Sequence, residues 1–262
     1  MFTHQLQRLF SAFLAIAAIM VFISCNPDDE ATNTSGGSGN SVGPPDETSE
    51  WLNPNLNYGS VSDQDGNTYA TIQIGTQEWM AENLRTTKYA NGDPIPNVTD
   101  ANQWSNLTTG AWVHYNNDSQ YEIPYGKLYN WYTVADPRNV CPTGWHVPTD
   151  AEWTVLIDYL GGESVAGGKM KTTGNLEAAT GLWQSPNAEA TNSSGFSGAP
   201  GGMIFPYAWE DYYNFGGGGY WLSSSDPGES NARTRFLSNL NGGAFMSVGS
   251  KQGGSSIRCL RD

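Results

Sequence analysis

The chain has 262 residues, with 26 acidic and 12 basic side chains and a formal net charge of −14. Phosphate backbones and anionic lipid head groups are bound through Lys and Arg, so this balance argues against a nucleic-acid partner and against adsorption to a membrane surface. Aromatic residues make up 12% of the chain, charged residues only 15%, and there are 31 glycines. Disordered chains have few aromatic residues and many charges. The composition therefore predicts a folded, loop-rich and largely β domain, which its acidity keeps soluble.

The first residues carry the pattern of an export signal. Arg8 precedes an almost continuous apolar run, residues 9–23, which is short for a membrane-spanning helix and has signal-peptide length. The run ends at Ser24-Cys25, which resembles the lipobox of bacterial lipoproteins, although Phe22 stands where leucine is usual. We expect residues 1–24 to be removed and Cys25 to be lipidated. An ordinary secretory signal and a single anchor helix are the alternatives.

A polar segment follows the cysteine. It begins with Asn-Pro-Asp-Asp-Glu at residues 26–30, which resembles the surface-export signal of Bacteroidota lipoproteins. Residues 31–60 are mostly Ser, Gly, Asn, Thr and Pro, the composition of a flexible tether. We therefore expect residues 25–60 to tether one domain, residues 61–262, to an outer membrane, with that domain exposed at the cell surface.

The start of this domain predicts a β-hairpin. Asp65-Gly66 is a turn signal, and residues 68–74 alternate between apolar and polar side chains, the pattern of a half-buried strand. Gly75-Thr76 then turns the chain into a second strand at Trp79-Met80. Residues 111–115 predict a further strand.

One helix is well specified. Thr149 and Glu152 fit a capping box, in which each side chain binds the backbone of the other residue. Four apolar side chains then share one helical face: Trp153, Leu156, Ile157 and Leu160. Gly161-Gly162 predicts the end of this helix. Residues 128–134, by contrast, fit either a strand or a buried helix, because periodicity does not decide between them.

The last third of the chain predicts long loops and short strands. Residues 174–219 are glycine-rich, irregular and aromatic, and ordered loops of this length are uncommon unless they are functional. Four short runs then predict the strands of a terminal meander: residues 220–223, 233–237, 243–248 and 256–260.

Five motifs in a fixed order resemble a known family. They read Gly-Thr-Gln-Glu-Trp-Met-Ala-Glu-Asn-Leu at residues 75–84, Tyr-Gly-Lys-Leu-Tyr-Asn-Trp-Tyr at 125–132, Cys-Pro-Thr-Gly-Trp-His-Val-Pro-Thr-Asp-Ala-Glu-Trp at 141–153, Ser-Gly-Phe-Ser with Pro-Gly-Gly within 194–202, and Ser-Ile-Arg-Cys-Leu-Arg-Asp at 256–262. Together they resemble the Fibrobacter succinogenes major paralogous domain. That family is similar, more remotely, to the formylglycine-generating enzyme and the C-type-lectin-like fold. The resemblance implies an α+β domain with short twisted antiparallel sheets, few helices and long ordered loops, and its relatives suggest ligand or glycan binding and adhesion.

The cysteines predict a disulfide. If Cys25 carries lipid, Cys141 and Cys259 remain, and two cysteines in an oxidising compartment favour a bridge over two free buried thiols. Formylglycine-generating enzymes need a reactive cysteine pair, which a structural bridge does not supply. We therefore do not expect oxidase activity.

Other catalytic and metal signals are weak. His114 and His146 lack a third ligand at zinc spacing, and we expect His146 to pack in the core with one ring nitrogen hydrogen-bonded. Asp63 and Asp65 fit a turn better than a calcium loop. The motifs of hydrolases and nucleotide-binding proteins are missing from the sequence. We expect no enzyme activity, no cofactor and no bound metal.

The aromatic side chains in and after the long loop are the remaining candidates for binding. Sugars stack on aromatic rings, and glycine lets the backbone approach a ligand. The candidate ligand-binding residues are Tyr207, Trp209, Tyr212, Tyr213 and Tyr220. Core packing is the competing interpretation of the same rings, and we assign Trp79, Trp131, Trp145 and Trp153 to the core.

Three hypotheses for function follow. The first is a non-catalytic surface module for a glycan or another envelope ligand, which predicts exposed rings around a concave surface. The second is a structural or adhesive module for protein–protein contact, which predicts a flat patch or an open edge strand. The third is an enzyme descended from the fold of the formylglycine-generating enzymes, and the missing reactive cysteine pair counts against it.

Overall fold

The computed structural model describes residues 49–205 and 212–262. The predicted signal segment and Cys25 lie outside the described residues, as do Tyr207 and Trp209. Within the described part of the chain, no helix combines the length and the apolar composition needed to cross a membrane.

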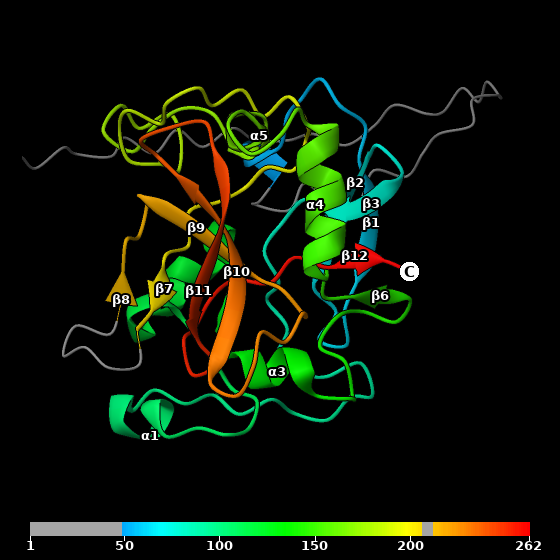
Figure 1. The fold of residues 1–262 in the computed structure, drawn as a ribbon, viewed down its shortest axis with the longest axis vertical. Coiled ribbons are helices and arrows are strands. Elements are labelled where there is room, and N and C mark those ends of the chain that lie inside the picture. Colours follow the sequence, from blue (N-terminus) through cyan, green and yellow to red (C-terminus); the bar gives the residue numbers. More distant parts are fainter. Residues whose placement is uncertain (1–48, 206–211) are drawn as a thin grey trace, which may run out of the picture. The chain divides into compact units, whose positions relative to one another are not determined.

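Short strands dominate the structure (Figure 1). The strands are β1 (Gly59–Ser62), β2 (Thr68–Ile74), β3 (Gln77–Met80), β4 (Trp112–Val113), β5 (Leu128–Tyr129), β6 (Trp145–His146), β7 (Met203–Ile204), β8 (Tyr212–Tyr213), β9 (Gly218–Leu222), β10 (Asn231–Ser238), β11 (Ala244–Ser250) and β12 (Leu260–Arg261). The α-helices are α1 (Ala101–Ser105), α2 (Glu122–Tyr125), α3 (Trp131–Ala135), α4 (Asp150–Tyr159) and α5 (Ala166–Met170). Single 3₁₀ turns lie at Ser49–Trp51, Tyr115–Asn117 and Ser119–Tyr121. This mixed architecture agrees with the expected α+β class.

The largest sheet has the strand order β1-β2-β3-β12-β6, and every pair in it is antiparallel. The predicted hairpin is confirmed, because Ile74 lies opposite Gln77 across a two-residue turn. Gly75 begins that turn with a φ of +61°, which a side chain would disfavour. β12 joins β3 to β6 within this sheet, and Leu260 lies opposite both Trp79 and His146.

The second sheet has the order β11-β10-β9 and is antiparallel throughout. It confirms three of the four strands predicted for the terminal meander. The fourth prediction is wrong, because β12 covers only Leu260–Arg261 and pairs with β3 and β6. The reason is the distance along the chain: residues 251–259 carry the end of the chain away from β11, and local sequence pattern does not show which strand a distant segment will join.

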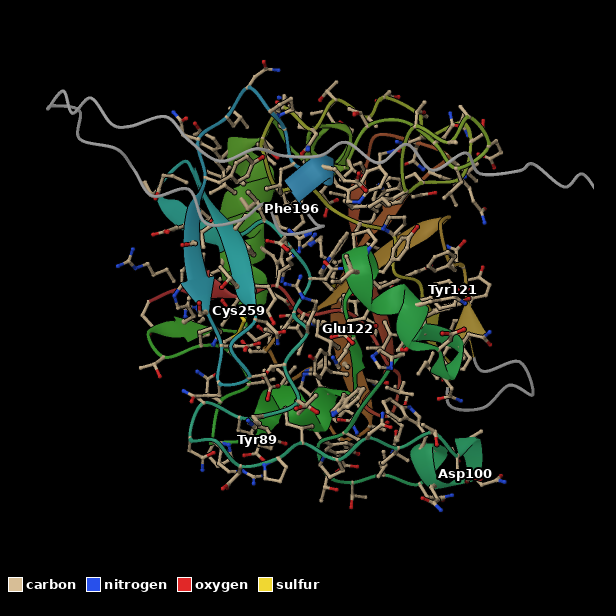
Figure 2. The ribbon with its side chains drawn as sticks, turned by 180° about the vertical axis from the view of Figure 1, so that it is seen from behind. Tyr89, Asp100, Tyr121, Glu122, Phe196 and Cys259 are labelled. Atoms are coloured by element: carbon tan, nitrogen blue, oxygen red, sulfur yellow. A yellow bond between two sulfur atoms is a disulfide. The ribbon has the colours of Figure 1, made fainter. Side chains whose placement is uncertain are left out.

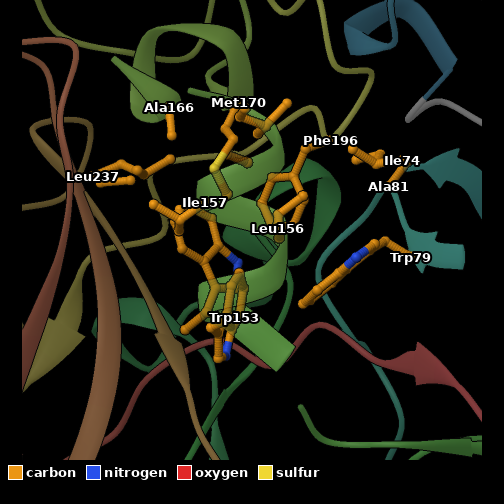
Figure 3. Close-up of a cluster of buried hydrophobic side chains, with 14 of the residues drawn as sticks. Ile74, Trp79, Ala81, Trp153, Leu156, Ile157, Ala166, Met170, Phe196 and Leu237 are labelled. Carbon is orange, nitrogen blue, oxygen red and sulfur yellow. The ribbon is translucent and has the colours of Figure 1, made fainter. Parts of the chain in front are cut away.

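α4 packs between the two larger sheets (Figures 1 and 3). Its predicted capping box is present, since Thr149 Oγ1 accepts from the backbone N–H of Glu152 and the Glu152 carboxylate accepts from the backbone N–H of Thr149. Leu156 and Ile157 on its buried face meet Leu237 of β10 on one side. The other side of the same core holds side chains from the first sheet, including Ile74 and Trp79 (Figure 3).

Large aromatic rings form much of the interior. The core assignment of Trp79, Trp131, Trp145 and Trp153 is confirmed, because each is at most 6% exposed. The pattern of residues 128–134 fitted either a strand or a helix, and the segment contains both. β5 ends at Tyr129 and α3 begins at Trp131.

The folded part starts before residue 61, the boundary that composition predicted. Four side chains of the supposed tether pack against the large core: Trp51, Leu52, Leu56 and Tyr58. These apolar residues are scattered among Asn, Pro and Gly, so the mean composition of residues 31–60 concealed them.

Candidate functional site

Of the predicted binding residues, Tyr212, Tyr213 and Tyr220 lie within the described part of the chain, around β7, and they do not form one exposed stack. Tyr212 and Tyr213 form β8, which pairs with Met203 and Ile204 of β7. The ring of Tyr213 is 50% exposed and lies with its centroid 5.2 Å from that of Phe205. Tyr212 instead packs on the ring of Tyr115, at 5.1 Å between centroids.

Tyr220 is part of the wall of a groove. Its side chain is only 7% exposed and is stacked on Phe236, with 4.7 Å between ring centroids and 24° between planes. Its hydroxyl accepts a hydrogen bond from Asn214 Nδ2 at 3.1 Å. Burial raises the pKa of Tyr220, so its hydroxyl is neutral at physiological pH.

This groove, here called the sheet groove, lies between β7 and the β9-β10-β11 sheet and has a volume of about 190 Å³. Its lining residues come from β7, the three strands of the sheet and the segment after β11: Met203, Ile204, Phe205, Tyr220, Leu222, Ala232, Thr234, Phe236, Ser247, Val248, Gly249, Ser250, Gly253 and Ser255. Tyr220 is the only residue in this set with a titratable side chain.

The alternation of β10 explains why the sheet groove is uncharged. Side chains of a strand point alternately to opposite faces. Thr234 and Phe236 face the groove together with the opposing side chains of β9. On the other face, Arg233 pairs with Asp150 of α4 and Leu237 is buried in the core. The charges of β10 therefore lie on the α4 side, and the groove side is left with neutral groups.

Sequence reasoning missed Phe205, Thr234 and Phe236 as candidate site residues. A signal was present for the last two, because residues 232, 234 and 236 are uncharged whereas Arg233 and Arg235 alternate with them. Only the folded structure brings Phe205 to the same place, from a segment almost 30 residues earlier.

A family comparison supports the resemblance found in the motifs. The model of the Fibrobacter succinogenes major domain matches residues 72–261. The chain belongs to this family. No curated protein and no solved structure matches the chain.

The disulfide predicted within the Fibrobacter succinogenes major domain is present. Cys141 and Cys259 are bonded and both are fully buried. The bridge ties the segment before β6 to the segment before β12. Cys259 is labelled in Figure 2.

The histidines of the domain bond to carboxylates. His114 Nε2 lies 2.8 Å from Glu122 Oε2, and Lys127 Nζ lies 2.5 Å from the other oxygen of Glu122 (labelled in Figure 2). Burial raises the pKa of Glu122, but the hydrogen bonds from Lys127 and His114 outweigh burial and hold that pKa below its usual range.

The expectation for His146 is wrong. Its side chain is 34% exposed rather than packed in the core, and both ring nitrogens bond to carboxylates: Nδ1 to Asp262 at 2.7 Å and Nε2 to Glu152 at 3.0 Å. The neighbouring Trp145 and Val147 are buried because they lie on the opposite side of the strand segment, which the period-two pattern of β6 explains.

The Asp63 segment is a turn, as expected. Asp63 Oδ1 accepts from the backbone N–H groups of Asp65 and Asn67, and Oδ2 accepts from the hydroxyl of Tyr69. Its oxygens are therefore engaged by the turn itself. Within residues 49–205 and 212–262, no three His, Cys, Asp or Glu side chains gather into a set that could hold a metal ion.

Proposed function

We propose that the protein is a cell-surface lipoprotein whose domain binds a neutral glycan or a chemically similar envelope ligand in the sheet groove, without catalysis. The observation that carries the proposal is the composition of the groove: stacked aromatic rings, Ser and Thr hydroxyls, and no charged side chain. Rings stack on the C–H faces of sugars, and hydroxyls exchange hydrogen bonds with those of a sugar. An uncharged lining favours a neutral ligand, because a buried charge without a partner is costly.

The finer fold is part of the same proposal. We infer a C-type-lectin-like fold, remotely related to formylglycine-generating enzymes, and the small antiparallel sheets and long loops support it. Because Cys141 and Cys259 are bonded to each other, the bridge supports a binding role over the oxidase chemistry of those enzymes.

The surface location rests on the start of the sequence. The apolar run that ends at Ser24-Cys25 supports lipidation of Cys25 and anchoring in the outer membrane, and residues 26–30 support export to the surface. Cys25→Ser should release the protein from the membrane fraction, and intact-mass measurement of the wild-type protein should show the acyl chains. Membrane retention of the variant would contradict the anchor.

The groove is tested by a glycan screen of the chain from residue 26 onward, made in an oxidising compartment. Phe236→Ala removes one of the stacked rings, and Tyr213→Ala removes the exposed ring beside Phe205. We expect Phe236→Ala to abolish binding and Tyr213→Ala to weaken it. Tyr159→Ala is the matched control, because Tyr159 is a 65% exposed ring on α4 and does not line the groove. Failure of the wild-type chain to bind plant, host and microbial glycans would contradict the proposal.

A second candidate function, protein–protein contact, is favoured by the edge strand β11. β11 ends its sheet, contains no charged residue, and exposes Phe245, Met246 and Val248 by 39%, 49% and 55%. Natural edge strands are usually protected by charges, proline or bulges. The occupant we infer is a second copy of this chain, paired antiparallel about Ser247 so that Met246 lies opposite Val248.

Light scattering tests this second candidate. The wild-type chain should form dimers at high concentration, and Val248→Lys should make it monomeric, since two lysines would then face apolar side chains across the contact. A monomeric wild-type chain would contradict self-pairing.

A further inference from the structure

A second cavity adjoins the sheet groove across β7. It has a volume of about 90 Å³, and Ile204 and Phe205 line both spaces. About 10–15 Å³ of such space holds one water, so each space admits a group larger than a single water. Phe205 is 40% exposed and contributes to the lining of both spaces.

The second cavity differs from the groove in its chemistry. Besides Phe205, its aromatic lining consists of Trp104 and Tyr212, and its polar lining consists of Thr99, Asp100 and Asn117. The Asp100 side chain lies at the start of α1, well away from Phe196 in the core (Figure 2). Aromatic surface next to carboxylate, amide and hydroxyl groups is suited to a ligand that has both C–H faces and hydroxyls.

The polar groups of this cavity retain hydrogen-bonding capacity. Asp100 Oδ1 accepts from the backbone N–H of Gln103 at 2.8 Å, and Asn117 Nδ2 donates to the backbone oxygen of Thr99 at 3.2 Å. Within the described residues, the second carboxylate oxygen of Asp100, the amide oxygen of Asn117 and the hydroxyl of Thr99 make no hydrogen bond. Three acceptor oxygens are thus available to the hydroxyls of a ligand.

We propose that the two spaces are adjacent subsites for one linear, neutral oligosaccharide, with one ring in the sheet groove, the next in the second cavity, and Phe205 between them. This inference rests on the proposed glycan-binding function and adds to it the ligand class: a chain of at least two rings. Asp100 makes the second subsite selective, because its carboxylate accepts hydrogen bonds from hydroxyl groups and repels the carboxylates of acidic sugars.

The test is a titration of the chain from residue 26 onward with neutral β-1,4-linked gluco-, manno- and xylo-oligosaccharides of one to six rings. Oligogalacturonates are the acidic comparison. We expect affinity to rise at least tenfold from one ring to two or three rings and then to level off, with no binding of oligogalacturonate.

One double variant, with a control, tests where the length dependence arises. Thr99→Ala combined with Asn117→Gly removes polar groups of the second cavity, and glycine suits the φ of +57° at position 117. This double variant should bind two-ring and longer ligands about as weakly as one ring, with one-ring binding unchanged. Thr108→Ala is the control, because Thr108 is exposed on the segment after α1 and lines neither space.

The outcomes separate the two proposals. Binding that does not depend on ligand length, or a double variant that behaves like the wild type, would overturn the second subsite and leave the sheet groove standing. Absence of binding at every length would overturn the proposed function, and this inference with it.

Discussion

The guanidinium group of Arg258 donates from Nε to the side-chain oxygen of Asn83 at 2.7 Å, although the two residues are 175 positions apart. Both side chains are buried, and Trp221 Nε1 donates to the same oxygen at 2.8 Å. Asn83 in turn donates to the backbone oxygen of Tyr125 at 2.7 Å. This pair therefore connects the segment after β3 to β9 and to the end of the chain.

Arg258→Lys should strongly destabilise the domain. Arg258 also donates to the backbone oxygens of Met80, Phe196 and Ser197, so lysine would leave several buried acceptors unpaired. At ~1–3 kcal/mol for each such group, we expect the free energy of unfolding to fall by ~3 kcal/mol or more in urea titrations. Arg261→Lys is the control, since the Arg261 side chain is 61% exposed and pairs with Glu78 at the surface. A loss below ~1 kcal/mol for Arg258→Lys would contradict this role.

Lys171→Met should also destabilise the domain. Lys171 is fully buried, and its Nζ donates to the backbone oxygens of Ala188, Ser238 and Asn241 at 2.7, 2.8 and 2.9 Å. Methionine fills similar space but leaves these oxygens without a donor, so we expect a loss of ~3 kcal/mol in the free energy of unfolding at pH 7. An equal loss in Lys169→Met, which removes one hydrogen bond to Leu160, would argue against a special role for Lys171.

The same lysine predicts a dependence on alkaline pH. Burial lowers the pKa of Lys171 from 10.5 to about 8. Between these two values the unfolded chain binds more protons than the folded chain, so this group makes stability rise with pH across that window. The difference in unfolding free energy between the wild type and Lys171→Met should therefore increase from pH 8 to pH 10. A difference that is constant or decreases would contradict the lowered pKa.

Breaking the disulfide should lower stability mainly through the unfolded state. Cys141 and Cys259 are 118 positions apart. Freeing a loop of this length costs ~4–5 kcal/mol in the chain-entropy model. We expect Cys141→Ala combined with Cys259→Ala to unfold at lower urea concentration, and reductant to shift the wild type alone. Equal midpoints for the wild type and the double variant would contradict a stabilising bridge.

His146 should contribute stability on the acidic side of neutrality. Burial lowers the pKa of His146, but the carboxylates of Asp262 and Glu152 outweigh burial and raise that pKa above 6.5. The contribution is therefore fully present below pH 6.5 and is lost as pH rises through the higher folded-state value. Relative to His146→Gln, the wild type should lose thermal stability between pH 6 and pH 8.5. Parallel pH profiles of the two proteins would contradict the raised pKa of His146.

Local patterns predicted the elements that are stabilised locally. The capping box of Thr149 and Glu152 and the alternation of residues 68–74 each lie within one element, so the sequence alone sufficed for α4 and for β2. His146 was misjudged for the opposite reason. One of its partners, Asp262, is 116 positions away, and no local pattern indicates that pairing.

The candidate site was predicted only in part. Tyr213 and Tyr220 were selected for their rings, but sequence does not show that one is half exposed and the other almost buried. The difference depends on tertiary contacts, because Tyr220 of β9 stacks on Phe236 of the neighbouring strand β10, whereas Tyr213 lies on the two-stranded β7-β8 sheet beside the exposed ring of Phe205.

The sequence by itself determined the family, the signal-like start, the disulfide pair and the best-defined helix and hairpin. Each of these depends on residues close together in the chain or, for the disulfide, on a choice among very few possible pairings. Tertiary structure alone decided that β12 enters the first sheet and that Phe205 and Phe236 line the same groove. Those contacts join residues far apart in the chain, and their free energy depends on the packing of the whole core rather than on any segment.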